Sequence, residues 1–168
     1  MAYWFRSRLS TDLEIYLYEV DAILENFKRV SGVRFVGEFY DMIDITAYSK
    51  TEDVIYRSYE FNKDSYVDGV YRAIINATGS SDRLNRLSFK EMPLVDGKYT
   101  QKEYTYEGFV CLCGAMLLRA ETSGVRGIKE KRSVSDTWAE WMRKHPEQAV
   151  LAMFDADKAF QYVMNGLK

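Results

Sequence analysis

Apolar residues recur with a helical period near the start of the chain. From Leu13 to Phe27 they return every three or four positions, which is the spacing of a single helical face. The letters TDLE at 11–14 form a capping box, in which the first and last side chains satisfy free N–H groups at a helix start. Gly32 is typical of a helix end. The pattern therefore predicts a helix over about 12–30.

The period changes to two after this helix. Residues 33–40 and 43–48 alternate apolar with polar side chains, and a polar turn at 49–52 leads to a third segment, 54–61. Short strands with tight links are typical of an antiparallel meander. Both alternation sets of the third segment are mixed, so the pattern leaves its buried face open.

Helical spacing returns from residue 64 or 65 and ends near Gly79, with a helical turn expected around 84–87. The second half predicts helices over about 103–121 and 135–144. A last helix begins at Pro146, a residue favoured at a first helical position. Its apolar residues are Val150, Leu151, Phe154, Phe160, Val163 and Met164.

The order of these elements predicts an α+β fold. A helix, a three-stranded antiparallel meander and a second helix make up the N-terminal half, and a mainly helical C-terminal half packs on it. The 168 residues contain no internal repeat, low-complexity tract or linker. A chain of this length suits one core, so we expect a single domain over 1–168.

Composition indicates the cellular location of the protein more than its function. The 23 Lys and Arg residues against 25 Asp and Glu give a net charge of −2, without the basic excess of a dedicated nucleic-acid binder. No segment approaches the roughly 20 apolar residues that span a bilayer, and no signal peptide is evident at the N-terminus. We expect a soluble, cytoplasmic protein with no membrane partner.

The two cysteines, Cys111 and Cys113, lie two positions apart within the predicted helix 103–121. Residues with this spacing point to opposite sides of a helix, whereas a strand would place both thiols on one side. A structural zinc site needs four ligands, and the chain adds only His145 to the cysteines. Core packing, with Gly108, Cys111 and Ala115 on one face of small residues, is the interpretation; no metal or cofactor is expected.

No catalytic constellation stands out. His145 is the only histidine and precedes a proline, so we expect it to cap the junction of two helices. Asp155 and Asp157 could hold a cation in a loop, but helical periodicity makes them two solvated positions that point apart. No nucleophile motif occurs. Whether the protein is an enzyme stays uncertain, and the residues favour a negative answer.

The helix–strand–strand–strand–helix order resembles that of double-stranded-RNA-binding domains, but their lysine-rich second-helix start is replaced by the letters KDSYVD at 63–68. The order also resembles the core of restriction-endonuclease-like nucleases. That resemblance implies a metal-dependent site with Asp44 on the second strand and Glu60 and Lys63 near the third. The family pattern spaces the last two by two positions, whereas here they are three apart.

The segment 119–132 is basic, with a local charge of +3 around two glycines. Its basic residues are Arg119, Arg126, Lys129, Lys131 and Arg132. Such a segment attracts phosphate, nucleic acid or an acidic protein, but charge runs are more often solvated loops, which is the favoured interpretation. Binding of nucleic acid or phosphate is therefore an alternative function.

Aromatic residues suggest the preferred function. The chain holds 13 tyrosines, and Trp and Tyr dominate the energetics of many protein interfaces. The expected contact residues are Tyr40, Tyr48, Tyr56, Trp138 and Trp141. We expect a non-enzymatic protein-binding module, such as an inhibitor, an immunity-type protein, an adaptor or a chaperone. Its partner is expected to be another protein, and a homodimer is among the states this allows.

Overall fold

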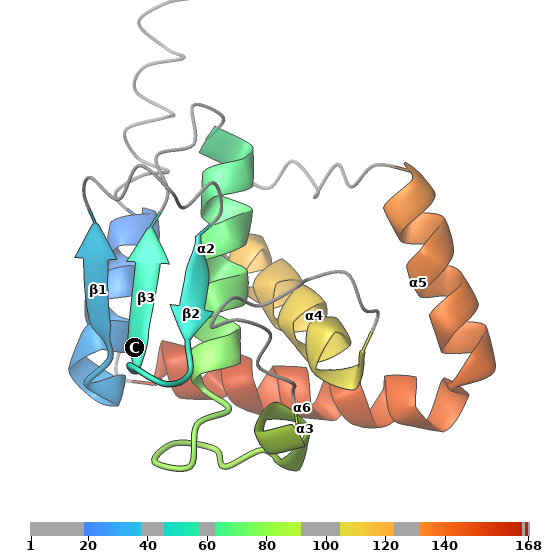
Figure 1. The fold of residues 1–168 in the computed structure, drawn as a ribbon. Helices are drawn as coiled ribbons and strands as arrows, with labels where there is room; N and C mark the ends of the chain where they lie inside the picture. The colour runs from blue at the N-terminus through green and yellow to red at the C-terminus, as the bar shows by residue number, and fades with distance from the viewer. Residues whose placement is uncertain are drawn as a thin grey trace, which may run out of the picture.

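The computed structural model describes residues 19–37, 46–57, 63–91, 105–122, 132–165 and 167. Residues 19–31 are helical, and the elements that follow are β1 (Arg34–Gly37), β2 (Ala47–Ser49), β3 (Val54–Arg57), α2 (Lys63–Ala77), α3 (Leu87–Glu91), α4 (Tyr106–Glu121), α5 (Arg132–Lys144) and α6 (Pro146–Met164). Figure 1 shows the sheet at one side, α2 beside it, α4 beyond α2, and α6 running beneath them. The expected α+β class and the helical second half are confirmed.

The first predicted helix is confirmed over its described part. The described residues of its apolar stripe, Val20, Ile23, Leu24 and Phe27, are buried, and Phe27 is 0% exposed. Gly32 adopts a φ of 70° and its N–H donates to the Lys28 carbonyl at 2.9 Å. A glycine in this left-handed backbone conformation is a common way for an α-helix to end. The capping box at 11–14 lies outside the described residues.

The sheet differs from the predicted meander. β2 and β3 form the expected antiparallel hairpin, but β1 pairs with β3 in parallel, so the strand order is β1-β3-β2. Alternation identifies strands without naming their partners, and the meander assumed that neighbours in sequence pair in space. The antiparallel expectation is therefore wrong for β1.

The central position of β3 explains its mixed pattern. Val54 and Ile55 point to opposite faces of the sheet, yet they are only 2% and 0% exposed. A central strand that is covered on both faces shows no simple alternation. The sequence did not decide which face of this strand is buried, and the structure shows that both faces are buried at the Val54–Ile55 end.

Helix α2 is the centre of the fold. Its apolar stripe, from Val67 to Ile75, is fully buried, and the helix contacts β2 and β3 on one side and α4 on another. Gly114 of α4 allows the second contact, because a Cβ atom there would lie 2.8 Å from three carbon atoms of Ile75. Helices α2 and α4 thus approach closely at a glycine.

Helix α4 matches the predicted 103–121 closely, but its cap differs. The N-cap is Thr105, whose Oγ1 accepts from the Gly108 N–H at 3.1 Å. The capping-box letters at 100–103 lie outside the described residues. Helix α5 begins at Arg132, three residues earlier than predicted. None of the helices in the described ranges is both long and apolar enough to cross a bilayer.

Candidate interaction surface

Helix α6 begins at a sharp junction with α5. Pro146 occupies its first turn and His145 is its N-cap, as the sequence predicts. The His145 side chain makes no capping hydrogen bond, but its carbonyl accepts from the Ala149 N–H at 2.9 Å. The imidazole ring lies against the Trp141 ring, with centroids 5.4 Å apart.

The buried side of α6 is made of small residues. It consists of Ala149, Ala152, Ala156, Ala159 and Val163. These positions are three or four apart, so they form one stripe, and α4 is the main neighbour of the helix. Short side chains let two helix backbones approach each other closely. The alanine stripe therefore fixes which way α6 faces.

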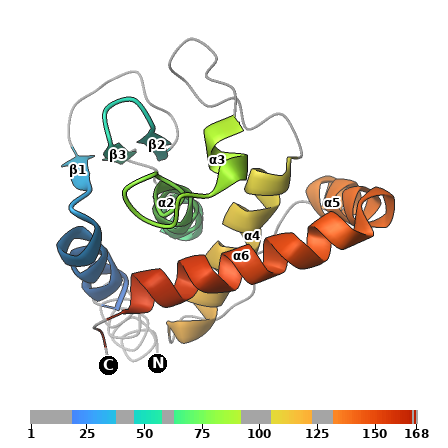
Figure 2. The same ribbon diagram turned by 90° about the horizontal axis from the view of Figure 1, so that it is seen from below.

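Large apolar side chains of α6 point away from the core. Val150, Leu151, Met153 and Phe154 are 53%, 57%, 48% and 62% exposed. In Figure 2, seen from below, α6 crosses in front of α4. We use the name "outward face of α6" for Val150, Leu151 and Phe154 together with the charged Glu147 and Lys158. Of the six apolar residues predicted for this helix, Val163 alone is fully buried.

An open pocket of about 280 Å³ adjoins this face. Its lining residues are Leu84, Asn85, Arg86, Leu87, Asp155 and Lys158. Leu87 is 68% exposed, so it adds another large apolar side chain beside α6. Asp155 and Asp157 are helical and point apart, as predicted, but only Asp157 is solvated as expected. Asp155 is half-buried and accepts from the Tyr106 hydroxyl at 2.8 Å.

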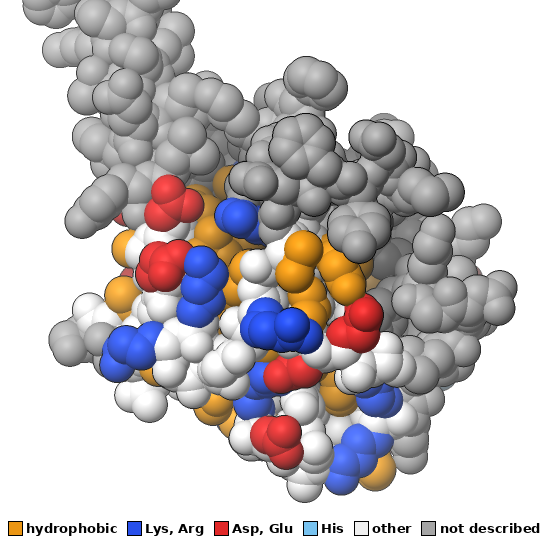
Figure 3. Space-filling model, turned by 60° about the vertical axis from the view of Figure 1, so that its left-hand side comes forward, with side chains coloured by type: hydrophobic (Ala, Val, Ile, Leu, Met, Phe, Trp, Pro, Cys, Tyr) orange, Lys and Arg blue, Asp and Glu red, His pale blue; other side chains and the backbone are white. Residues whose placement is uncertain are grey.

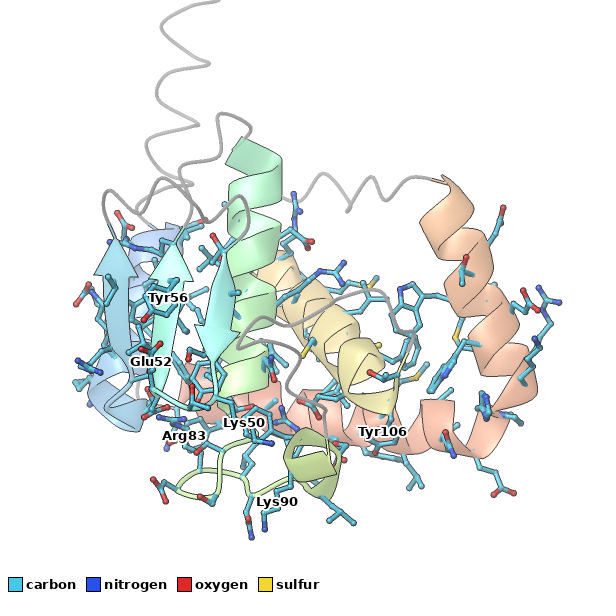
Figure 4. The ribbon with its side chains drawn as sticks, in the orientation of Figure 1. Lys50, Glu52, Tyr56, Arg83, Lys90 and Tyr106 are labelled. Atoms are coloured by element: carbon cyan, nitrogen blue, oxygen red, sulfur yellow. The ribbon has the colours of Figure 1, made fainter. Side chains whose placement is uncertain are left out.

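Two of the predicted contact tyrosines carry hydrogen bonds within the fold. Tyr48 is 2% exposed and its hydroxyl donates to Asp53 at 2.6 Å. Burial, followed by the hydrogen bond to this carboxylate, raises the pKa of Tyr48 to about 12. Tyr56 is half-buried and donates to Glu52 at 2.6 Å (Figure 4). Tyr40 lies outside the described residues.

The two predicted contact tryptophans lie in an aromatic cluster that joins α4 to α5. The Phe109 ring lies 5.3 Å from Trp138 and 5.2 Å from Trp141, measured between centroids. Trp138 is only 8% exposed and Trp141 is half-buried. The structure therefore brings these two together in packing, separate from Tyr48 and Tyr56.

Asp53 and Arg83 tie the β2–β3 hairpin to the end of α2. The Arg83 guanidinium donates to both Asp53 carboxylate oxygens, at 2.8 and 2.7 Å, and to the Ala77 carbonyl at 2.9 Å. Figure 4 shows Arg83 below the strands. Partial burial pushes the pKa of Asp53 upward, but the hydrogen bonds and charge of Arg83 and the Tyr48 hydroxyl outweigh it. The pKa of this carboxyl therefore lies below its ordinary value.

A buried ion pair that the sequence did not reveal joins Arg86 to Glu107. They are 7% and 1% exposed. The guanidinium also donates to the Ile75 carbonyl at 2.9 Å and to the Thr78 hydroxyl at 2.6 Å, and Ser88 donates to Glu107 at 2.7 Å. Because every partner belongs to the fold, this pair is a structural support for the end of α2. Its members are 21 positions apart, and no local pattern links them.

The cysteines sit on α4 as the helical alternative predicted. Cys111 is buried and Cys113 half-buried, and they are not joined in a disulfide. Burial raises the pKa of both thiols, to about 11 for Cys113. Since the thiolate is the reactive form, neither thiol is activated as a nucleophile at neutral pH. Within the described ranges, no three His, Cys, Asp or Glu residues are placed to hold a metal ion.

The alternative sites fall largely outside the described residues. In the basic segment, Arg119 is 7% exposed within α4 and Arg132 begins α5, whereas Arg126, Lys129 and Lys131 are not described. Of the residues in the nuclease hypothesis, Asp44 and Glu60 also lie outside the described residues, and Lys63 is the first residue of α2. On the face drawn in Figure 3, basic and acidic side chains lie interspersed over the described part.

No protein-family model, curated protein or solved structure matches this chain. Among the described residues, α6 exposes more large apolar side chains than any other helix, since α4 exposes only Met116 and Leu117.

Proposed function

We propose that this protein is a protein-binding module and that its contact surface is the outward face of α6. The observation that carries the proposal is that α6 buries its small side chains and exposes its large apolar ones. Small alanines are buried, while Leu151 and Phe154 are 57% and 62% exposed. An inhibitor, immunity-type protein, adaptor or chaperone would each use such a surface.

The physical case rests on hydration. Covering one large apolar side chain is worth about 1.5–3 kcal/mol relative to leaving it in water. Folding realises only part of this for Val150, Leu151 and Phe154, because they stay 53%, 57% and 62% exposed. Contiguous apolar groups on a surface are typical of an interaction site, and a few such anchors provide most of the binding energy.

The rim of this face is polar, as in most specific interfaces. Glu147, Asp157 and Lys158 are exposed around the apolar residues. Charged groups at a rim contribute little affinity, but they orient the partner and discriminate against others. A partner of this face therefore needs an apolar strip with charges of both signs beside it.

The aromatic residues expected from the sequence have a smaller part in this proposal. Trp141 and Tyr56 are half-buried and could contribute at the edge of a contact, whereas Tyr48 and Trp138 are packed inside. The nucleic-acid alternative gains no support from Arg119, whose side chain is packed in the fold. The preferred surface thus moves from tyrosines and tryptophans to the aliphatic and phenylalanine side chains of α6.

Replacing Leu151 and Phe154 together by Gln tests the proposal. Gln keeps the helix and removes the apolar contact. We expect the wild-type chain to capture partner proteins from the native cell and the double variant to fail to capture them. The purified partner should likewise bind the wild type and not the variant. Met116→Gln is the matched control, because Met116 is 52% exposed on a different helix, α4. Equal capture by all three proteins would exclude this face.

A further inference from the structure

We infer that the outward face of α6 binds the same face of a second copy of this chain, with the two α6 helices antiparallel. The inference rests on the proposed function and names its partner. It is carried by the spacing of the exposed residues and by the order of their charges along the helix.

The exposed residues form a seam. Glu147, Leu151, Phe154 and Lys158 follow one another at intervals of four, three and four positions. This is the alternation by which one helix packs along another, and it keeps the residues on one side over three turns. The buried alanines occupy the opposite side of α6, so the seam and the core contact do not compete.

The seam is complementary to itself only when reversed. Its four positions are symmetric about the midpoint between Ala152 and Met153. In an antiparallel pair, Leu151 therefore meets Phe154 of the second copy, and Glu147 meets Lys158 of the second copy. By the two-fold symmetry each contact occurs twice, with apolar groups in the middle and opposite charges at both ends.

A parallel pair lacks this match. It would place Glu147 against Glu147 of the second copy and Lys158 against Lys158 of the second copy, which are repulsive contacts. The charge order thus selects the antiparallel arrangement. Lys158 is available for it, because its side chain is 69% exposed and its 3.2 Å contact with Asp155 is an exposed pair within one helix.

The length of the seam sets the strength of the dimer. Four residues over three turns span about 16 Å of helix, which is a small contact. We expect dissociation constants of about 1–100 μM, where modest interfaces fall. Well below this concentration range, we expect the protein to be monomeric.

Sedimentation velocity of the full chain from about 1 to 500 μM tests the inference. The wild type and Met116→Gln should pass from monomer to dimer over this range. The Leu151→Gln and Phe154→Gln double variant should remain monomeric at every concentration, and its circular dichroism should match that of the wild type. A dimer that this variant leaves intact would place self-association elsewhere and overturn the inference.

Charge reversal tests the orientation. Glu147→Lys places Lys against Lys of the second copy twice, and we expect dimerisation about tenfold weaker. Adding Lys158→Glu restores opposite charges, so the double reversal should return to within about threefold of the wild type. If Glu147→Lys has no effect, or the second change does not restore the dimer, the antiparallel seam is wrong.

Failure of the inference is distinguishable from failure of the proposed function. A wild-type chain that is monomeric throughout overturns the inference. If capture of another protein then still depends on Leu151 and Phe154, the proposed function stands with a different partner. If capture does not depend on Leu151 and Phe154, the self-association inference and the proposed function are both wrong.

Discussion

Around α4 a charged side chain is buried, whereas along α6 apolar side chains are left in water. Glu107 is 1% exposed, yet its carboxylate accepts hydrogen bonds from Arg86 and Ser88. Phe154 has no group to satisfy, yet it is 62% exposed. The buried Glu107 carboxylate is thus fully paired within the fold, whereas the apolar side chains on the outward face of α6 are not covered.

This difference separates residues that stabilise the fold from residues available to a partner. A buried charge is tolerated only when it is paired, so its partners are part of folding. An exposed Phe or Leu contributes little to folding, so changing it should leave stability almost intact. Changes at the interior should therefore unfold the protein, and changes at the outward face should affect association alone.

The largest effect is expected from Glu107→Ala. The substitution leaves the Arg86 guanidinium buried without its carboxylate, and breaking a buried pair in this way costs about 3–5 kcal/mol. Urea unfolding followed by circular dichroism would measure the loss. Glu121→Ala, at the exposed end of the same helix, is the control and should change stability by less than about 0.5 kcal/mol. Similar values for the two would refute the buried pair as a support.

A smaller loss is expected from Ala156→Leu on the buried side of α6. Ala156 is 0% exposed, so three added carbon atoms must displace packed neighbours, at a cost of about 1–3 kcal/mol. Leu151→Gln, on the outward face of the same helix, should cost less than about 0.5 kcal/mol in the monomer. Midpoints of urea unfolding at low protein concentration would compare the two. The reverse order would mean that α6 packs by its other side.

The smallest of these losses is expected from Asp53→Asn, because Asp53 is 47% exposed and solvent screens its pair with Arg83. We expect about 1 kcal/mol near neutral pH. Asn also tolerates the φ of 52° at this position, which limits backbone effects. The exposed Asp82→Asn is the control.

The same variant has a pH signature. The pKa of Asp53 is lowered in the fold, so its contribution is complete above the unfolded value of about 4 and is lost as pH falls through the lower folded value. The difference in unfolding free energy between wild type and Asp53→Asn should therefore shrink below about pH 4. A difference that is constant from pH 7 to pH 2 would show that the ion pair does not stabilise the fold.

Periodicity predicted the helices well and the strand pairing poorly. The stripe of α2 and the end of the first helix at Gly32 follow from local spacing and local backbone preference. The parallel pairing of β1 with β3 does not, because alternation states which residues share a face and is silent about the neighbouring strand. The pair of Arg86 and Glu107 was equally hidden, since only the fold brings the two together.

The sequence by itself determined that residues 146–164 form a helix with apolar groups, because Pro146 starts it and good helix formers fill it. Only the tertiary structure decided which side is buried. Size alone would favour Leu151 and Phe154 for the core, but a close approach to α4 accommodates alanine and excludes longer side chains. That preference left the large residues outside, where the surface for a partner is proposed.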